Sequence, residues 1–146
     1  MLTKSTKTQK IKEIMCKHPD AISANKTLKQ AAIEMQKYDF GFLPVKQNGH
    51  VTGVITDRDI VLRAISKGKD PSKIKLKDAM SKKVFFCYET DDLKKAAQIM
   101  SKKQINRLAV YNKKKQLTGI LSLGDITRKC KDISWCGKIS KAIHKK

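Results

Sequence analysis

Two similar halves follow each other in this 146-residue sequence. A shift of 65 residues places the segment Ile11–Met15 on Leu76–Met80 and keeps several later apolar residues in register. One extra residue in the second half raises the shift to 66, after which Thr52–Gly53 matches Thr118–Gly119. An internal repeat of this kind predicts a fold made of two structurally equivalent units.

Each half carries the pattern of a helix, a hairpin and a second helix. Asn25 and Thr90 are the predicted N-caps of the first helices. Alternating apolar residues around polar turns predict hairpins over 42–55 and 107–121, preceded by short strands near 21–22 and 86–88 and followed by helices from 57 and 123. The i, i+3, i+4, i+7 spacing that predicts one amphipathic helix per half is formed by Leu28, Ala31, Ala32 and Met35, and by Leu93, Ala96, Ala97 and Met100.

The order of elements in each half is therefore β-α-β-β-α. A three-stranded sheet in a unit of about 60 residues has too little core to stand alone. We expect an α/β (α+β) fold in which two β-α-β-β-α repeats pack sheet to sheet with pseudo-two-fold symmetry. The expected boundaries are 10–68 for the first repeat, 75–131 for the second and 132–146 for a basic C-terminal tail, with Pro71 in the linker.

The charge of the chain leaves two interpretations open. The formal net charge is +20, which is typical of proteins that bind nucleic acid. However, 29 of the 33 basic residues are lysine, and they spread along the whole chain instead of forming one stripe. Bidentate contacts to phosphates and bases favour arginine. A solvated lysine-rich surface is the simpler interpretation, and a basic adaptor for nucleic acid is the alternative.

Several protein classes find no support in the sequence. It contains neither a long apolar run nor a signal peptide, so we expect a cytoplasmic protein without a membrane span. Its four cysteines form no C-x-x-C motif and no cluster with histidine, which predicts free thiols and no metal site. The histidines lie away from any nucleophile in a shared motif, so we expect neither an enzyme nor catalytic residues.

The repeated phrases resemble those of the cystathionine β-synthase (CBS) domain family over residues 10–131. They are Gly41–Val45 and Thr52–Ile60 in the first half, and Asn106–Val110 and Thr118–Ile126 in the second. The resemblance implies a tandem pair, or Bateman module, that binds AMP, ATP, S-adenosylmethionine or a similar adenosine compound between the repeats. It also implies a regulatory homodimer that requires no cofactor. Because nothing else is attached to the pair, we expect it to act through a partner protein.

Four residues are the main candidates for ribose binding. Thr56 and Asp59, and their counterparts Ser122 and Asp125, stand where a strand passes into a helix. A carboxylate can accept hydrogen bonds from ribose hydroxyls, and the start of a helix favours phosphate. The alternative is a capping box, in which both side chains only satisfy the start of the helix.

Further ligand contacts are expected around these four residues. Arg58 can reach a phosphate, whereas its counterpart Gly124 has no charge, so we expect two unequal sites. The resemblance places Arg107 near ligand phosphates, with Phe42 at the equivalent position. It also places Ala21, Ile22, Cys87 and Tyr88 against an adenine ring, and the alternative for these four is that they belong to the core.

The tail contains Trp135 and a short basic helix with Ile139 and Ile143 on one side. We expect Trp135 to pack against its own module, and a dimer or partner contact is the alternative. Three functions thus remain open: an adenosine-binding regulator, a basic adaptor for nucleic acid, and a structural dimer with empty clefts.

Overall fold

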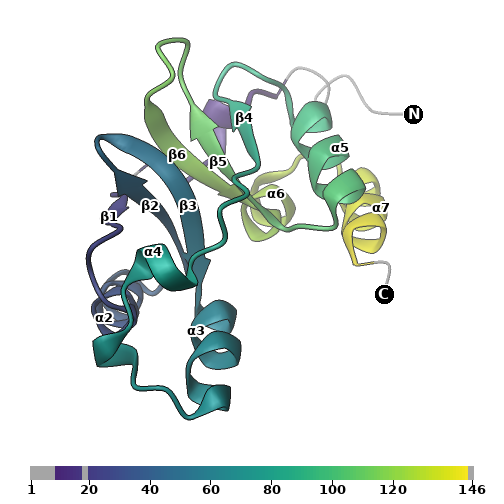
Figure 1. Ribbon diagram of the computed structural model, residues 1–146. Helices are drawn as coiled ribbons and strands as arrows, with labels where there is room; N and C mark the ends of the chain where they lie inside the picture. The colour runs from purple at the N-terminus through teal and green to yellow at the C-terminus, as the bar shows by residue number, and fades with distance from the viewer. Residues whose placement is uncertain (1–8, 18–19, 145–146) are drawn as a thin grey trace. The chain divides into compact units, whose positions relative to one another are not determined.

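The computed structural model describes residues 9–17 and 20–144. The chain forms two compact units (Figure 1). The repeat-1 unit is Asp20–Val84, and the repeat-2 unit joins the N-terminal segment to Phe85 and all that follows it. Each unit is built on one three-stranded sheet.

The repeat-1 unit has the sheet order β1-β2-β3, in which β1 runs parallel to β2 and β2 runs antiparallel to β3. Its elements are β1 (Ile22–Ser23), α2 (Leu28–Tyr38), β2 (Phe42–Gln47), β3 (His50–Thr56), α3 (Asp57–Arg63), the short 3-10 helices η2 (Ile65–Lys67) and η3 (Pro71–Lys73), and α4 (Leu76–Ala79).

The repeat-2 unit has the equivalent order β4-β5-β6, with the same parallel and antiparallel pairings. Its elements are η1 (Ile11–Glu13), β4 (Phe86–Tyr88), α5 (Leu93–Lys103), β5 (Arg107–Tyr111), β6 (Leu117–Ser122), α6 (Leu123–Lys129) and α7 (Ile133–Ile143). The mixed α/β class and the β-α-β-β-α order of both repeats are confirmed. The packing of one sheet on the other stays a prediction.

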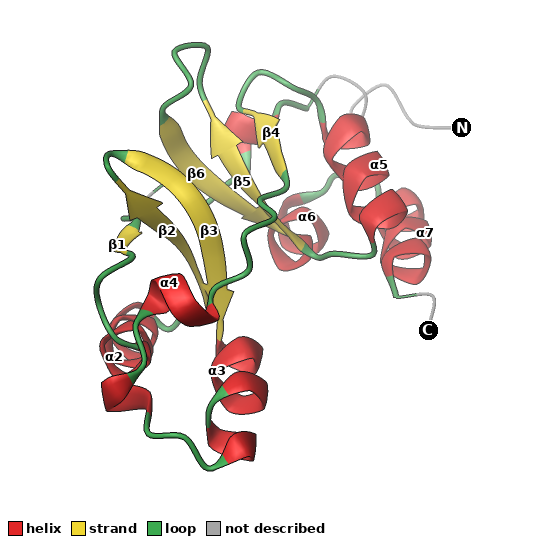
Figure 2. Cartoon of the chain, in the orientation of Figure 1, coloured by secondary structure: helices red, strands yellow, loops and turns green. Residues whose placement is uncertain are grey.

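Each sheet buries one face under its own helices (Figure 2). In the repeat-1 unit, Leu28 and Met35 of α2 and Ile60 of α3 pack against sheet residues such as Val45 and Ile55. In the repeat-2 unit, helices α5, α6 and α7 cover the equivalent face. The apolar residues whose spacing predicted the first helix of each half are therefore mostly the residues that pack into the two cores.

The first helix of each unit begins two residues later than predicted. Thr27 caps α2, since its Oγ1 accepts a hydrogen bond from the Gln30 amide, and Asp92 caps α5 by accepting from the Lys95 amide. The predicted N-caps Asn25 and Thr90 are wrong, because both residues lie in the turn that precedes the observed N-cap. Several neighbouring residues in these turns have side chains that can cap, and only the backbone path selects one.

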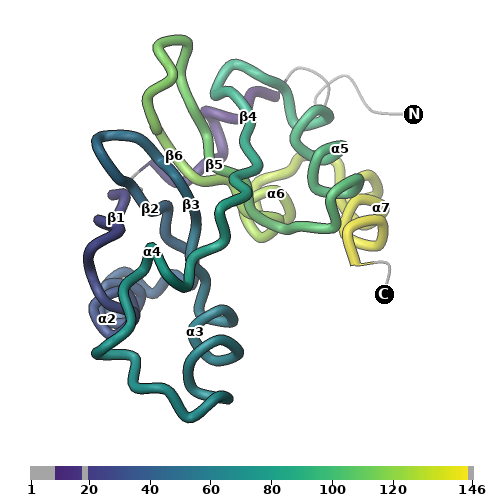
Figure 3. Tube along the Cα trace, in the orientation of Figure 1, coloured from purple at the N-terminus to yellow at the C-terminus, as the bar shows by residue number. Residues whose placement is uncertain are grey.

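The sheets are completed by segments that exchange places between the repeats. The opening segment of repeat 1 pairs with β6 of the repeat-2 unit, because Cys16 exchanges both backbone hydrogen bonds with Ile120 at 2.9 and 3.0 Å. The equivalent opening segment of repeat 2 pairs with β3 of the repeat-1 unit, through Ser81 and Val54. Figure 3 shows the purple N-terminal trace running to the green strands of the second repeat. Each unit therefore contains the opening segment of the other repeat.

Two glycines make room for these exchanged segments. A Cβ at Gly119 would lie 2.6 Å from Sδ of Met15 and 2.7 Å from the carbonyl oxygen of Cys16. At Gly53 the same atom would lie 2.5 Å from Sδ of Met80 and 2.8 Å from the Ser81 carbonyl oxygen. The Thr-Gly pair of each repeat thus permits close packing of backbone on backbone.

The tail folds back onto the repeat-2 unit as α7. Trp135 and Ile143 are buried in its core, which confirms that Trp135 packs against its own module. Cys136 is joined to Cys130 by a disulfide, so the prediction of free thiols is wrong for this pair. Cys16 and Cys87 are free. No helix within the described ranges is long and apolar enough to cross a membrane.

Candidate functional site

The junction of β3 and α3 holds the first pair of predicted site residues. Thr56 is the last residue of β3 and the N-cap of α3, and Asp59 is the third residue of the helix. The Asp59 amide donates to Thr56 Oγ1 at 3.1 Å, and the Thr56 amide donates to Oδ2 of Asp59 at 3.0 Å. The two side chains therefore form a complete capping box.

The junction of β6 and α6 repeats this geometry with Ser122 and Asp125. Both hydrogen bonds between these residues measure 3.0 Å. Asp125 is only 6% exposed, and the side chain of Asp59 is 17% exposed. Both repeats therefore contain the capping box that is the alternative to ribose binding. A ligand can still bind at these junctions if the carboxylates keep hydrogen-bond acceptors that the capping box does not use.

An arginine faces the other carboxylate oxygen at each junction. Nη2 of Arg63 lies 3.3 Å from Oδ1 of Asp59, and Nη2 of Arg128 lies 2.7 Å from Oδ1 of Asp125. Neither arginine is among the site residues predicted from the sequence. The spacing of four and three residues from Asp to Arg was the available signal, because such residues are neighbours on a helix surface.

Each carboxylate retains acceptor capacity beyond these contacts. An ionised carboxylate offers about four lone-pair sites, of which a backbone N–H and a guanidinium occupy two. Capping alone does not require the charge, because the box at the start of α2 is made by Thr27 and the amide of Gln30. A carboxylate at both equivalent junctions thus provides unused acceptors where ligand hydroxyl groups could donate.

The strand register places two further candidates beside these junctions. Phe42 lies directly across from Thr56, and Arg107 lies directly across from Ser122. Because side chains alternate along a strand, Phe42 and Arg107 are on the sheet face opposite the core residues Leu43 and Leu108. The structure therefore brings Phe42 to Thr56, and Arg107 to Ser122, on the sheet faces away from the helices.

The predicted adenine contacts divide between the two faces. Ile22 and Cys87 belong to the cores, and burial raises the pKa of the Cys87 thiol to about 12. Their neighbours Ala21 and Tyr88 are partly exposed and, by alternation, belong to the other face.

An aromatic cluster surrounds Tyr88 on that face of the repeat-2 unit. The ring of Phe86 packs edge-on against Tyr88 and Tyr111, with centroid distances of 5.7 and 5.5 Å. Phe86 and Tyr111 were missed in the sequence, because only the pairing of β4 with β5 brings residues 23 positions or more apart side by side.

Arg58 has no charged counterpart at the second junction. It is exposed beside the start of α3, and the equivalent residue is Gly124. Nη1 of Arg128 lies 3.1 Å from where a Cβ of Gly124 would be, so the glycine leaves room for the Arg128 side chain. Arg128 faces the carboxylate of its own junction, as Arg63 does at the first, so it does not replace the charge of Arg58.

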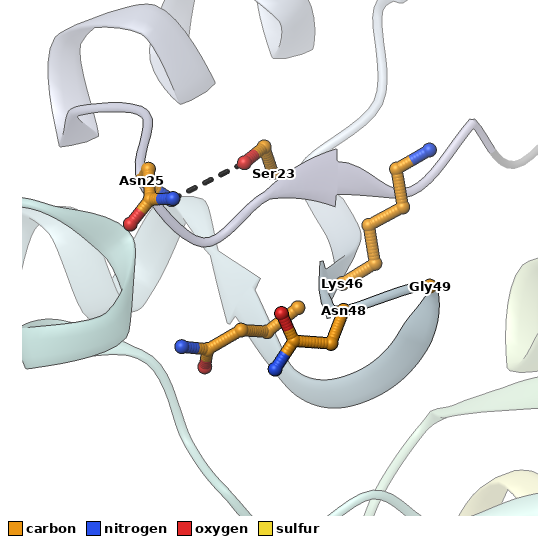
Figure 4. A pocket seen from close by; sticks show the side chains of 6 residues that line it. Ser23, Asn25, Lys46, Asn48 and Gly49 are labelled. Atoms are coloured by element: carbon orange, nitrogen blue, oxygen red, sulfur yellow. Dashed lines mark hydrogen bonds between the residues drawn. The ribbon is translucent and has the colours of Figure 1, made fainter.

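A polar hollow lies at the opposite end of the β1-β2-β3 sheet (Figure 4). It has a volume of 390 Å³ and includes Ser23, Asn25, Lys46 and the turn residues Asn48 and Gly49. The Asn25 amide donates to Ser23 Oγ at 3.3 Å. Since β3 begins at this turn and ends at Thr56, the strand separates the hollow from the capped junction by about 20 Å.

The described residues contain no group of three or more His, Cys, Asp or Glu side chains that could hold a metal ion. The chemistry offered at the junctions is therefore that of hydrogen-bond acceptors, guanidinium groups and an aromatic face.

The chain is similar to known proteins over most of its length. The chain is 33% identical over 116 residues to the CBS domain-containing protein YhcV of Bacillus subtilis, covering 80% of this chain and 81% of that protein. The CBS domain pair of protein MJ0100, in complex with 5′-methylthioadenosine and S-adenosyl-L-methionine, is 26% identical, with a TM-score of 0.74 over 89% of this chain and 98% of that one.

The hexameric CBS-CP12 protein from bloom-forming cyanobacteria shares the fold, with a TM-score of 0.78 and 24% identity over 87% of this chain and 75% of that one. The family model of the CBS domain matches twice, over residues 11–65 and 76–132. The chain belongs to the CBS domain family and carries two CBS domains in tandem.

Proposed function

We propose that this tandem CBS protein is a regulatory module that binds an adenosine-containing ligand, of the AMP, ATP or S-adenosylmethionine class, through the capped carboxylates of its repeats. The module has no catalytic role of its own in this proposal and acts through a partner protein. The ligands named for the MJ0100 domain pair support the choice of ligand class, because both contain adenosine. A cytoplasmic location stays a prediction of the sequence.

The observation that carries the proposal is the pair of capped carboxylates. Asp59 and Asp125 occupy equivalent positions, each held in place by one backbone amide and one arginine. A side chain fixed in this way loses little freedom when a ligand arrives, so more of each contact appears as affinity. Two neighbouring ribose hydroxyl groups match the remaining acceptors of a carboxylate.

Aspartate-to-asparagine substitutions test this role while sparing the cap. Asp59→Asn and Asp125→Asn keep an oxygen for the backbone amide and remove the charge. Hydrogen bonds to charged groups contribute about 1.5 to 3 kcal/mol, so each variant should bind AMP or S-adenosylmethionine about tenfold or more weakly at its own site. Calorimetry with each ligand measures the loss.

Gln30→Ala is the matched control, because it removes the equivalent acceptor from the capping box of α2. It should lower stability by about 1 kcal/mol and leave ligand affinity unchanged. If both asparagine variants bind like the unmodified protein, the two aspartates are helix caps only, and the proposed site is wrong.

The assembly in this proposal is a homodimer formed through the helices of the repeat-1 unit. In the repeat-2 unit, α7 covers α5 and α6, and the side-chain amide of Gln104 donates to the Ala142 carbonyl at 2.8 Å. No helix plays this part over α2 and α3 in the described residues of the repeat-1 unit. There Val61, Leu62 and Ile65 form an exposed apolar strip at i, i+1 and i+4. A second copy of the chain would supply the missing cover, because a two-fold interface places the same surface patch of both subunits against each other.

A further inference from the structure

A second hollow in the repeat-1 unit lies near the end of α3, on the far side of Arg63 from the capped junction. It has a volume of 470 Å³ and lies where α3 and η2 meet the segment that leads to the second repeat. Arg63, Lys67, Lys69 and Lys73 line it, against one acidic residue, Asp78. We call this feature the basic hollow. The backbone of Arg63 is about 10 Å along the helix axis from the capped start of α3, and its guanidinium reaches back to within 3.3 Å of Asp59.

The floor and one wall of the basic hollow are fixed. The apolar floor residues Ile74, Ala79 and Met80 also pack against the core of the unit. The guanidinium of Arg63 donates to the Ala79 carbonyl at 2.6 Å and to Ser81 Oγ at 2.9 Å, and it faces Asp59. A surface held in this way keeps its shape before any ligand binds.

The rim of the basic hollow consists of exposed lysines from two turns of the chain. Gly68, with φ +68°, ends η2 in the left-handed region and reverses the chain, so Lys67 and Lys69 both line the hollow. Asp70 caps η3 by accepting from the amide and hydroxyl of Ser72 at 2.9 and 2.7 Å, which positions Lys73 in the same short helix.

The charges around the basic hollow do not balance. Asp59 offsets Arg63, and Asp78 is the acid that lines the hollow beside three lysines. Asp70 is not among the lining residues; hydrogen bonds from Ser72 lower the pKa of Asp70, with a smaller contribution from Lys73. Lysines brought together around a concave surface repel one another, and an anion with several charges relieves that repulsion.

We propose that the basic hollow binds a small anion that carries several phosphate groups. Lysine binds phosphate as a point charge, and three lysines above a fixed guanidinium suit a chain of two or three phosphates. The volume is in the range of about 300 to 1,000 Å³ that is usual for small-ligand sites. Nucleic acid is a less suitable ligand for this site, because the four basic residues that line the hollow surround one concave surface and do not follow a long groove. The proposed anion site shares Arg63 with the adenosine site, but its lysines belong to the hollow alone, so the two proposals can be tested separately.

Inorganic tripolyphosphate is the probe, since it contains no adenosine and cannot use ribose contacts. Its affinity for the full chain would be measured by calorimetry in a buffer free of phosphate. The double variant Lys67→Gln/Lys73→Gln should bind it at least about tenfold more weakly, because charge-assisted contacts are lost. Lys113→Gln/Lys114→Gln is the matched control, since it removes the same charge from the exposed turn between β5 and β6.

Retained affinity in the control, together with the loss in the hollow variant, would establish the site. Equal losses in both variants would show that tripolyphosphate responds only to net charge, and absence of binding at millimolar concentration would also overturn the proposal. A single-stranded oligonucleotide completes the test. If the oligonucleotide binds more tightly than tripolyphosphate, and Lys67→Gln/Lys73→Gln abolishes that binding, the hollow contacts nucleic acid and the small-anion proposal is wrong.

Discussion

Substituting Gly119 tests the exchanged N-terminal segment directly. In Gly119→Ala the new methyl group would meet Sδ of Met15 at 2.6 Å and the carbonyl oxygen of Cys16 at 2.7 Å. The Met15 side chain can move, but the Cys16 carbonyl is fixed by its hydrogen bond from Ile120 at 3.0 Å. The segment must therefore shift, although Ile11 and Ile14 are almost fully buried in the same core.

The expected cost follows from these contacts. Overpacking of a core costs about 1 to 3 kcal/mol, and weakening the two Cys16–Ile120 hydrogen bonds adds up to about 1 kcal/mol each. We expect the free energy of unfolding to fall by about 2 kcal/mol, which lowers a urea midpoint by roughly 1 M. Gly53→Ala should behave alike in the repeat-1 unit, where Met80 and Ser81 take the corresponding places.

Gly137→Ala is the matched control for the same chemical change. Gly137 lies inside α7, and a Cβ there would meet no atom within 4 Å. Alanine is the better helix former, so this variant should gain about 0.5 to 1 kcal/mol. Urea unfolding followed by far-ultraviolet circular dichroism would measure all three variants. An unchanged or higher midpoint for Gly119→Ala, with the expected gain for Gly137→Ala, would refute the seating of the N-terminal segment against β6.

Two further predictions concern a buried thiol and the assembly. Burial raises the pKa of Cys87 from 9.0 to about 12, so the stabilisation that depends on its neutral thiol is complete below pH 9.0 and is lost as the pH rises towards 12. The unfolding free energy of Cys87→Ala should therefore decline less than that of the wild type over this pH range. Parallel declines in the two proteins would show that the Cys87 thiol is not the cause. Leu62→Glu should convert a dimer into a monomer in light scattering, whereas Ile133→Glu, at an even more exposed apolar residue outside the strip, should leave the dimer intact. A wild-type monomer at high concentration would exclude the dimer.

The elements that the sequence predicted well are those decided by local pattern. The helical spacing of Leu93 and Met100 reflects the face that packs into the core, and the Thr56–Asp59 spacing itself forms the capping box. The exact caps were missed because Thr27 and Asp92 compete with nearby residues of equal capping ability.

The features that could not be predicted depend on contacts between segments distant in the sequence, or on the direction that a side chain takes. Gly124 was interpreted only as a missing charge, whereas its lack of a Cβ also leaves room for the Arg128 side chain. The aromatic cluster of Phe86, Tyr88 and Tyr111 exists only after β4 has paired with β5. The Cys130–Cys136 disulfide depends on the turn that brings α7 back to α6, and cysteine spacing alone gave no indication of it.

The exchange of segments is the feature that sequence similarity alone leaves undetermined. Ile11–Met15 and Leu76–Met80 are equivalent in the repeat, so either segment matches the apolar surface of either unit equally well. The path of the chain decides between them, because each segment pairs with the strand before the second helix of the other repeat. Gly53 and Gly119 carry a local trace of this arrangement, since a strand interior disfavours glycine unless another backbone approaches closely. The Thr-Gly pair in each half therefore reports a neighbour that is far away in the sequence.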